Sequence, residues 1–308
     1  MKKIISFLIT LIILVFIYIY RDQITQYVLT EFSYRYSNVT QEANEYKKKL
    51  DIAYAKETDN FFPKNRQDII NIVYTSLNNG VDSFIYYCTD EYENCKSDTE
   101  KLASDSETLS SINNFVHPYN SYNKLSFKIN NYGKVEISVQ KQYSKKEIEL
   151  INKKVDEIYL TITNDRMNTN DKIKAIHDYI INNSAYDKAK AELVTNGSNI
   201  TNSEFRSETA YGVLLQGNGI CGGFSDAMEL FLNKMNVTTY KIASETHIWN
   251  LIYLDNKWVH LDLTWDNPIV NGDGKLLLHD FYLIETSKLT ELNTGHHLYD
   301  RQIYIEAQ

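Results

Sequence analysis

The chain is 308 residues long, 43% of them hydrophobic, and it carries a formal net charge of −8. This length and apolar content allow one large domain or two ordinary ones. The acidic balance argues against a nucleic-acid-binding surface, which needs clustered Lys and Arg. Gly and Pro are scarce, at 11 and 3 residues, which excludes collagen-like and low-complexity chains.

The N-terminus predicts a membrane anchor over residues 1–21. Two lysines precede an uncharged, mostly apolar run from Ile4 to Tyr20. As a helix this run would be about 26 Å long, close to the ~30 Å hydrocarbon core of a bilayer. No small-residue cleavage site follows it, so we expect the anchor to be retained. Lys2 and Lys3 place the N-terminus in the cytoplasm and the C-terminal domain outside, in a single-pass cell-membrane protein.

The three cysteines also bear on the location of the protein. In an oxidising compartment they make one pair and leave one thiol over. Cys88 and Cys95 flank a short polar stretch and are the predicted pair, whereas Cys221 lies far from both. In a reducing compartment all three would be free thiols.

Residues 22–140 are predicted as a polar, helix-prone stalk, to about residue 60, followed by a mixed extracytoplasmic region. Within it, "YNKLSFKINNYGKVEISVQKQY" (Tyr122–Tyr143) alternates apolar and polar residues on both sides of Asn131-Tyr132-Gly133. This pattern indicates a β-hairpin with a glycine-containing turn. Residues 141–308 are predicted as a second, C-terminal domain.

The C-terminal domain starts with two predicted helices. Ser144 and Glu147 fit a capping box, and the apolar residues after them recur at helical spacing. A second helix is expected over about 170–182. The polar stretch 188–209 is predicted as a loop, before a third helix that begins at Cys221.

After the Cys221 helix the period of the apolar residues changes from 3.6 to 2. "TTYKIASE", "THIWNLIYLD" and "KWVHLDLTWD" are predicted as three strands, with Asp255-Asn256 as a tight turn between the last two. The tail from Asn267 indicates loops with short strands, such as "LLLHDFYLIE". Helices combined with an antiparallel sheet predict the α+β class.

Cys221 is either an ordinary small buried residue or a reactive nucleophile. An unperturbed thiol, with a pKa of about 8.5, is only ~3% thiolate at pH 7. A helix N-terminus and an adjacent imidazolium both lower the pKa of a thiol. Cys221 stands at a predicted helix start, with Gly222 and Gly223 leaving its approach open.

A base and an orienting carboxylate come from the strands that follow. If a two-residue turn pairs Leu254 with Lys257, His247 and Asp262 become diagonal neighbours on one face, with backbones roughly 7–8 Å apart. An Asp–His hydrogen bond can bridge that distance, and His247 can then serve Cys221 as base. A slip of one residue would put the two side chains on opposite faces.

Three segments together resemble the transglutaminase-like superfamily in its bacterial form. They are "SETAYGVLLQGNGICGGFSDAMELFLNKM", "THIWNLIYLDNKWVHLDLTWDNP" and, upstream, "DKIKAIHDYIINNSAYD". The resemblance covers Asp171–Pro268 and does not extend before about residue 140. It implies a papain-like core, in which the helix that carries the nucleophile packs on an antiparallel sheet. It further implies Cys221 as nucleophile, His247 as base and Asp262 as orienting carboxylate. Many relatives carry Gln or another polar residue where this chain has Gly222.

The function implied is a membrane-anchored, extracytoplasmic cysteine enzyme. It would transfer acyl groups through a thioester from protein or peptide carboxamides, including those of the cell envelope, to an amine or to water. The alternative is a catalytically silent binding or scaffold module at the cell surface. No cofactor and no nucleic-acid partner are expected.

The remaining candidates have weaker signals. His260 shares the face of Asp262 and could contribute to the site, whereas His177 is expected in the core with a hydrogen-bond partner. His296 and His297 are expected in a loop outside the site. No Cys or His spacing indicates a zinc site. The three tryptophans are expected in the core and the groove wall: Trp249, Trp258 and Trp265.

Some polar residues could support the site without taking part in the reaction. Asn250, Asp266 and Tyr186 could hold the loops around it. The backbone N–H of Cys221 is one expected donor to an oxyanion. Gln216 or Tyr186 could supply the second donor.

Overall fold

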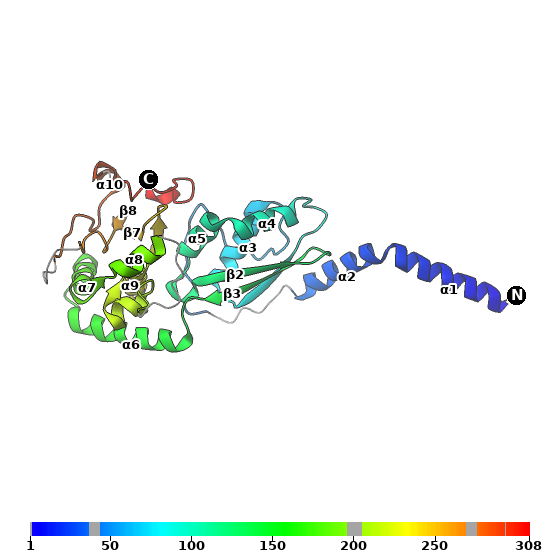
Figure 1. The fold of residues 1–308 in the computed structure, drawn as a ribbon, viewed down its shortest axis with the longest axis horizontal. Helices are drawn as coiled ribbons and strands as arrows, with labels where there is room; N and C mark the ends of the chain where they lie inside the picture. The colour runs from blue at the N-terminus through cyan, green and yellow to red at the C-terminus, as the bar shows by residue number, and fades with distance from the viewer. Residues whose placement is uncertain (1, 37–43, 196–204, 269–275, 293) are drawn as a thin grey trace.

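The computed structural model describes residues 2–36, 44–195, 205–268, 276–292 and 294–308. Along its long axis the molecule has three parts, which follow one another in chain order (Figure 1). An arm of two helices comes first. A sheet with its helices lies in the middle, and the part that carries Cys221 lies at the far end.

The arm consists of α1 (Lys2–Ile19) and α2 (Arg21–Tyr36) and extends away from the body (Figure 1). No single described helix is long and apolar enough to cross a membrane. The length and composition of a membrane span are reached only by two helical segments together, Ile5–Ile19 and Arg21–Leu29, which are bent by 66° relative to each other. The one straight transmembrane helix predicted from the sequence is therefore not supported. The helical stalk is also shorter than predicted, because residues 44–65 form no helix.

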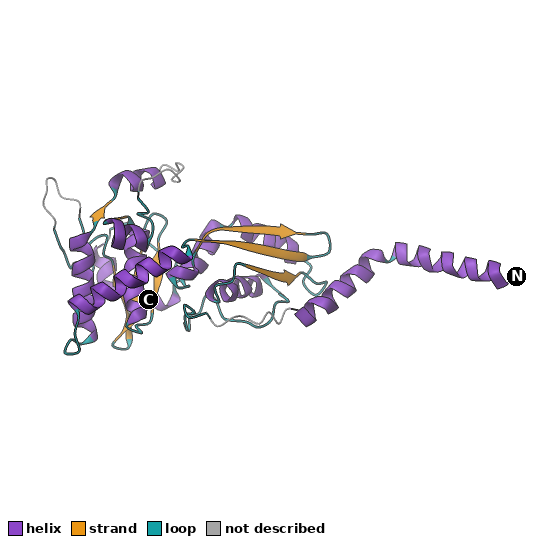
Figure 2. Cartoon of the chain, turned by 90° about the horizontal axis from the view of Figure 1, so that it is seen from below, coloured by secondary structure: helices purple, strands orange, loops and turns teal. Residues whose placement is uncertain are grey.

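The middle part is an antiparallel sheet of strand order β1-β3-β2 with three α-helices (Figure 2). The predicted hairpin is confirmed as β2 and β3. A disulfide joins Cys88, after β1, to Cys95, the first residue of α4, so the predicted pair is bridged. The elements are α3 (Arg66–Asn78), β1 (Ser83–Tyr87), α4 (Cys95–Ser104), α5 (Ser106–Asn114), η1 (Pro118–Asn120), β2 (Tyr122–Ile129) and β3 (Lys134–Lys141).

The far part packs α9 against a second antiparallel sheet, of order β6-β7-β8. Its helices and strands are α6 (Lys145–Ile162), α7 (Thr169–Asn183), β4 (Ala185–Tyr186), α8 (Lys188–Thr195), η3 (Gly212–Gln216), β5 (Asn218–Gly219), α9 (Cys221–Lys234), β6 (Thr239–Ala243), β7 (Ile248–Leu254), β8 (Lys257–Leu261), α10 (Thr286–Leu292) and η4 (Ile305–Ala307).

The predicted helices before α9 are confirmed as α6 and α7, and the Ser144–Glu147 capping box is present. Two predictions are wrong. Residues 188–195 form α8, not a loop, and the rest of that predicted loop lies partly outside the described residues. The described part of the tail forms no strand and only isolated bridges, from Ile284 to His260 and from Tyr299 to Ser244.

The β7–β8 register is the one predicted, with Leu254 opposite Lys257. Asp255 and Asn256 have φ of 50° and 64°, the positive values that a type I′ turn requires at both central positions. Because side chains alternate with a period of two, this turn fixes which residues share a face of the hairpin.

Buried contacts cross the predicted domain boundary near residue 140. The rings of Phe115 and Tyr240 lie 5.0 Å apart, in a hydrophobic cluster that also includes Ile137 and Trp249. A second cluster surrounds α6, α7 and α9. The division into residues 22–140 and 141–308 stays a prediction.

Two buried ion pairs hold α9 in place. Lys48 Nζ lies 2.6 Å from Glu229 Oε1, and Lys241 Nζ lies 2.5 Å from Asp226 Oδ1. Tyr143 donates to the other carboxylate oxygen of Asp226 at 2.5 Å. Charged residues are rarely buried unless paired, so these contacts explain how α9 carries two acids in the interior.

Candidate active site

Cys221 is the first residue of α9, and its side chain is half-buried and free of disulfide bonds. The preceding residue, Ile220, is extended, and its N–H donates to the carbonyl of Ser207 at 2.9 Å. A Cβ on Gly223 would lie 2.2 Å from that carbonyl, so the close approach requires glycine. The first N–H groups of a helix lack intrahelical acceptors, so they favour negative charge beside the Cys221 sulfur.

His247 joins Cys221 to Asp262. The residue is 8% exposed, and its Nε2 lies 2.5 Å from Asp262 Oδ2. The ring also lies close enough to Cys221 for the sulfur to raise its pKa. Because Nε2 is taken by the carboxylate, Nδ1 is the nitrogen left for the sulfur. The structure thus brings together the three residues predicted for the site.

Asp262 directly follows β8 and is almost fully buried, with both of its carboxylate oxygens in use. Oδ1 accepts the backbone N–H groups of Thr264 and Trp265 at 2.9 and 3.2 Å, and Oδ2 faces imidazole nitrogens. Burial alone would raise the pKa of Asp262, but the charge and hydrogen bond of His247, with a second bond from His297, hold it well below its usual range. Asp262 is therefore an anion at any physiological pH.

The anionic carboxylate determines the protonation of His247. Burial alone would lower the pKa of His247, but the charge and hydrogen bond of Asp262, together with contacts to Cys221, raise it to about 10. The ring therefore favours the imidazolium form at neutral pH. An imidazolium beside a sulfur stabilises a thiolate and can later donate a proton to a leaving group.

His297 is the residue of the site that the sequence analysis missed. It lies in a loop, as predicted, but its side chain is buried and contacts the candidate triad. Nε2 lies 2.8 Å from Asp262 Oδ2, and Nδ1 lies 2.6 Å from the hydroxyl of Thr294. His297 follows Asp262 by 35 residues within an irregular segment, so no periodicity or spacing could have indicated this contact.

His260 supports the site through Trp249. Its Nδ1 accepts from Trp249 Nε1 at 3.0 Å, and its Nε2 lies 3.0 Å from the hydroxyl of Thr286. Burial, and then the nearby His297, lower the pKa of His260 to about 3, so the ring is neutral. The ring of Trp249 is stacked on His247 with centroids 5.6 Å apart. Trp249 therefore forms a wall of the site, as predicted.

Tyr186 is close to the site, whereas Gln216 is engaged elsewhere. Burial, and then charge at Cys221 and at Asp262, raise the pKa of Tyr186 to about 12. Gln216 Oε1 instead accepts the backbone N–H of Arg206 at 2.8 Å. Tyr186 is thus near Cys221 and Asp262, whereas the side-chain oxygen of Gln216 is bound to a neighbouring loop.

The other supporting residues hold neighbouring elements together. Asn250 donates from its side chain to the carbonyl of Ser225 in α9 at 3.0 Å. Asp266 Oδ1 accepts the backbone N–H of Phe281 at 2.9 Å. Trp265 packs near the ring of His247, with centroids 6.4 Å apart, and Trp258 packs at 5.2 Å from Tyr240.

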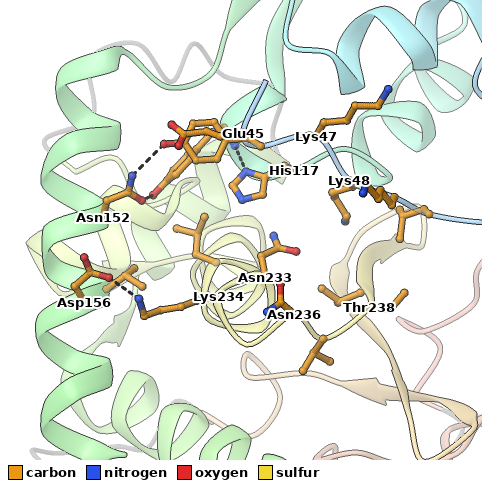
Figure 3. Close-up of a pocket in the computed structure, with 18 residues that line it drawn as sticks. Glu45, Lys47, Lys48, His117, Asn152, Asp156, Asn233, Lys234, Asn236 and Thr238 are labelled. Atoms are coloured by element: carbon orange, nitrogen blue, oxygen red, sulfur yellow. Dashed lines mark hydrogen bonds and ion pairs between the residues drawn. The ribbon is translucent and has the colours of Figure 1, made fainter. Parts of the chain in front are cut away.

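A cavity of about 640 Å³ opens at the opposite end of α9 (Figure 3). It is lined by residues such as Lys48, His117, Asn233 and Asn236. None of the three predicted catalytic residues lines it. It is therefore separate from the candidate active site.

Two groups of described side chains place three potential metal ligands within 4.8 Å of one another. One group is His247, Asp262 and His297, whose nitrogens and oxygens are already engaged around the candidate triad. The other is His177, Asp178 and His279, on α7 and the segment after β8. His177 is fully buried and hydrogen-bonded, as predicted.

One comparison with known proteins covers the three residues of the site. Residues 156–263 match the family model described as the transglutaminase-like superfamily, and this segment contains Cys221, His247 and Asp262. The resemblance seen in the sequence is confirmed over that segment. No curated protein matches the chain.

Two solved structures can each be aligned with 50% of this chain. One is a TGase, with 17% identity, a TM-score of 0.35, and coverage of 50% of this chain and 46% of the other. The second is a proposed cysteine protease from Cytophaga hutchinsonii, with 14% identity and a TM-score of 0.28, covering 50% of this chain and 65% of the other. This chain thus spans less than two thirds of either protein.

Proposed function

We propose that the protein is a cysteine enzyme that transfers acyl groups from protein or peptide carboxamides through a thioester. The observation that carries the proposal is the position of His247, which hydrogen-bonds to buried Asp262 and lies beside Cys221 at the start of α9. This is the order of nucleophile, base and orienting acid in a catalytic triad. The three groups come from the start of α9, the start of β7 and the end of β8. Packing of the core alone does not explain why they meet.

In the proposed reaction the Cys221 sulfur attacks the carbonyl carbon of the carboxamide. The oxygen becomes an oxyanion near the backbone N–H of Cys221, with the Tyr186 hydroxyl as proposed second donor. His247 then gives its proton to the departing nitrogen as the C–N bond breaks, which leaves the thioester. An amine or water, deprotonated by His247, attacks the thioester and releases the thiol.

The acceptor determines the activity. An amine gives transamidation, and water gives proteolysis or deamidation. The test uses the full chain in detergent, with a labelled-amine incorporation assay and a peptide-hydrolysis assay run in parallel. Activity in either assay that Cys221→Ala abolishes supports the proposal. If neither assay responds and Cys221 reacts with iodoacetamide like an ordinary thiol, the alternative of a silent binding or scaffold module stands.

We also propose that α1 and α2 anchor the protein to the cell membrane, with the remainder outside. The side chains of α1 are apolar and exposed, as in Phe7, Ile12 and Ile19 at 66–67%. The Cys88–Cys95 disulfide suits an oxidising compartment. Mass spectrometry of non-reduced peptides from cells should find this pair linked and Cys221 free. N-terminal sequencing of the membrane fraction should find residues before Tyr20 retained, and a mature start after the apolar run would overturn the anchor.

A further inference from the structure

A second cluster of polar side chains lies outside the candidate triad, between α7 and the segment that follows β8. His177 Nδ1 lies 2.9 Å from Asp178 Oδ1, and His279 Nε2 lies 2.7 Å from the same oxygen. On the other side of its ring, His177 Nε2 lies 3.1 Å from Asp266 Oδ2. Both His177 and Asp266 are fully buried.

The protons available cannot satisfy all these contacts. His279 Nε2 lies 2.7 Å from a carboxylate, which only accepts hydrogen bonds, and 2.6 Å from Lys174 Nζ, which only donates them. If Nε2 carries a proton, the proton faces the ammonium; if it does not, the lone pair faces the carboxylate. His177 has a carboxylate oxygen at each ring nitrogen, and only a doubly protonated ring would donate to both. At His279 no protonation state satisfies both neighbours.

A cation among these acceptors removes the conflict. The Lys174 ammonium partly fills this role, since it also lies 3.0 Å from Asp178 Oδ2. Its side chain is half exposed and can move away into solvent. A metal ion in its place would take the lone pairs of His279 Nε2 and His177 Nδ1 and one carboxylate oxygen of Asp178.

We propose that His177, Asp178 and His279 form a binding site for a divalent transition metal of the zinc class. Two imidazoles and one carboxylate suit Zn²⁺ and its neighbours, whereas Mg²⁺ and Ca²⁺ prefer oxygen ligands alone. Asp266 fits the outer position of such a site, because a metal-bound histidine usually donates its other N–H to a carboxylate. With three protein ligands, one further ligand such as water would complete the usual four-coordinate set.

The ion would fasten the segment that positions Asp262. His279 lies in the stretch where Leu278 N–H donates to the carbonyl of Asp266 at 2.9 Å and Asp262 N–H donates to the carbonyl of Phe281 at 3.1 Å. A metal bound by α7 and by His279 would therefore link α7 to the segment 278–281. That segment is in turn hydrogen-bonded to the backbone of Asp262 and of Asp266. No sequence spacing indicates this site, because His279 lies 101 residues after Asp178.

The test titrates Zn²⁺, and separately Co²⁺ with detection of its visible absorption, into the full chain in detergent after chelation. We expect one equivalent to bind. His279→Ala should weaken binding roughly 100-fold or more, since loss of even an outer partner typically costs 10–100-fold. Lys174→Ala should strengthen binding severalfold, because the competing ammonium is gone.

His297→Ala is the matched control, because it disrupts the other group of three potential ligands and should leave the dissociation constant unchanged. The proposal is overturned if the wild type binds no equivalent of either ion, if His279→Ala binds as tightly as the wild type, or if binding disappears in His297→Ala. Weaker binding by Lys174→Ala would also overturn it. His279 is about one-third exposed, so its variant is expected to fold, and a thermal unfolding curve without metal verifies this.

Discussion

The imidazole of His297 lies 2.8 Å from Oδ2 of Asp262, the same oxygen that His247 approaches at 2.5 Å. Two rings therefore share one carboxylate oxygen in a buried site. Because ionised Asp262 only accepts hydrogen bonds, Nε2 of His297 carries the proton in this contact. His297 thus orients the carboxylate that orients His247.

His297→Ala should lower kcat/KM in the acyl-transfer assay by about 10–100-fold, the range typical for partners one step removed from the reacting groups. The loss should be smaller than for Asp262→Ala, because Asp262 keeps its bonds to His247 and to two backbone N–H groups. Exposed His296 is the matched control, and His296→Ala should stay near the wild-type value. Equal losses in both histidine variants would contradict this role.

Cys221→Ala and His247→Ala should each reduce kcat by roughly 10⁶-fold, because either change removes the nucleophile or its activation. Asp262→Ala should cost less, about 10⁴-fold, since the base remains but loses its orientation. The double variant of Cys221 and His247 should be no slower than Cys221→Ala, because residues acting as one unit are not additive. Single-turnover measurement of thioester formation gives these values, and additive losses would show that the residues act separately.

Thermal unfolding should depend on pH through His247. Its pKa in the folded protein is about 10, above the ordinary 6.5, so its ion pair stabilises the fold fully below pH 6.5. This stabilisation is lost as pH rises through 10. The Tm difference between the wild type and His247→Gln should therefore shrink from pH 6 to pH 10, while Asp262 stays ionised throughout. A Tm difference that grows with pH would show that folding lowers the pKa of His247 instead of raising it.

For the buried pair of Lys48 and Glu229, we expect removal of one partner to destabilise the fold more than replacement of both. Lys48→Met should lower the free energy of unfolding by about 3–5 kcal/mol, because it leaves a buried carboxylate without its partner. Adding Glu229→Met should recover most of that loss, since an apolar pair of similar volume often replaces a buried ion pair without cost. Denaturant unfolding measures both. Exposed Lys56, paired with Asp51, provides the control, and Lys56→Met should change stability by less than about 1 kcal/mol.

Local rules predicted the part of the site that lies within one hairpin. Asp255 and Asn256 favour the tight turn, and the turn with the period-two pattern sets the register that brings His247 to Asp262. The capping box at Ser144 is equally local, because its partners are three residues apart. Such features depend on the chemistry of a few neighbouring residues, which the sequence displays directly.

The features that escaped prediction depend on packing between distant segments. His297 and His279 lie in irregular stretches, where no period indicates which way a side chain points. The break after Ile19 was also missed, because hydropathy reports the length of an apolar run and not whether its helix stays straight. The short strand β1 was not predicted either, since it becomes a strand by pairing with β3.

The Lys48–Glu229 contact also has a mechanical consequence. Lys48 is among the first described residues after the arm, and Glu229 lies two turns along the helix that begins at Cys221. A pulling force on the arm enters the body through the segment around Lys48 and reaches α9 through this buried pair. If the arm is held in a membrane, as proposed, part of any tension on it reaches the helix that carries the nucleophile.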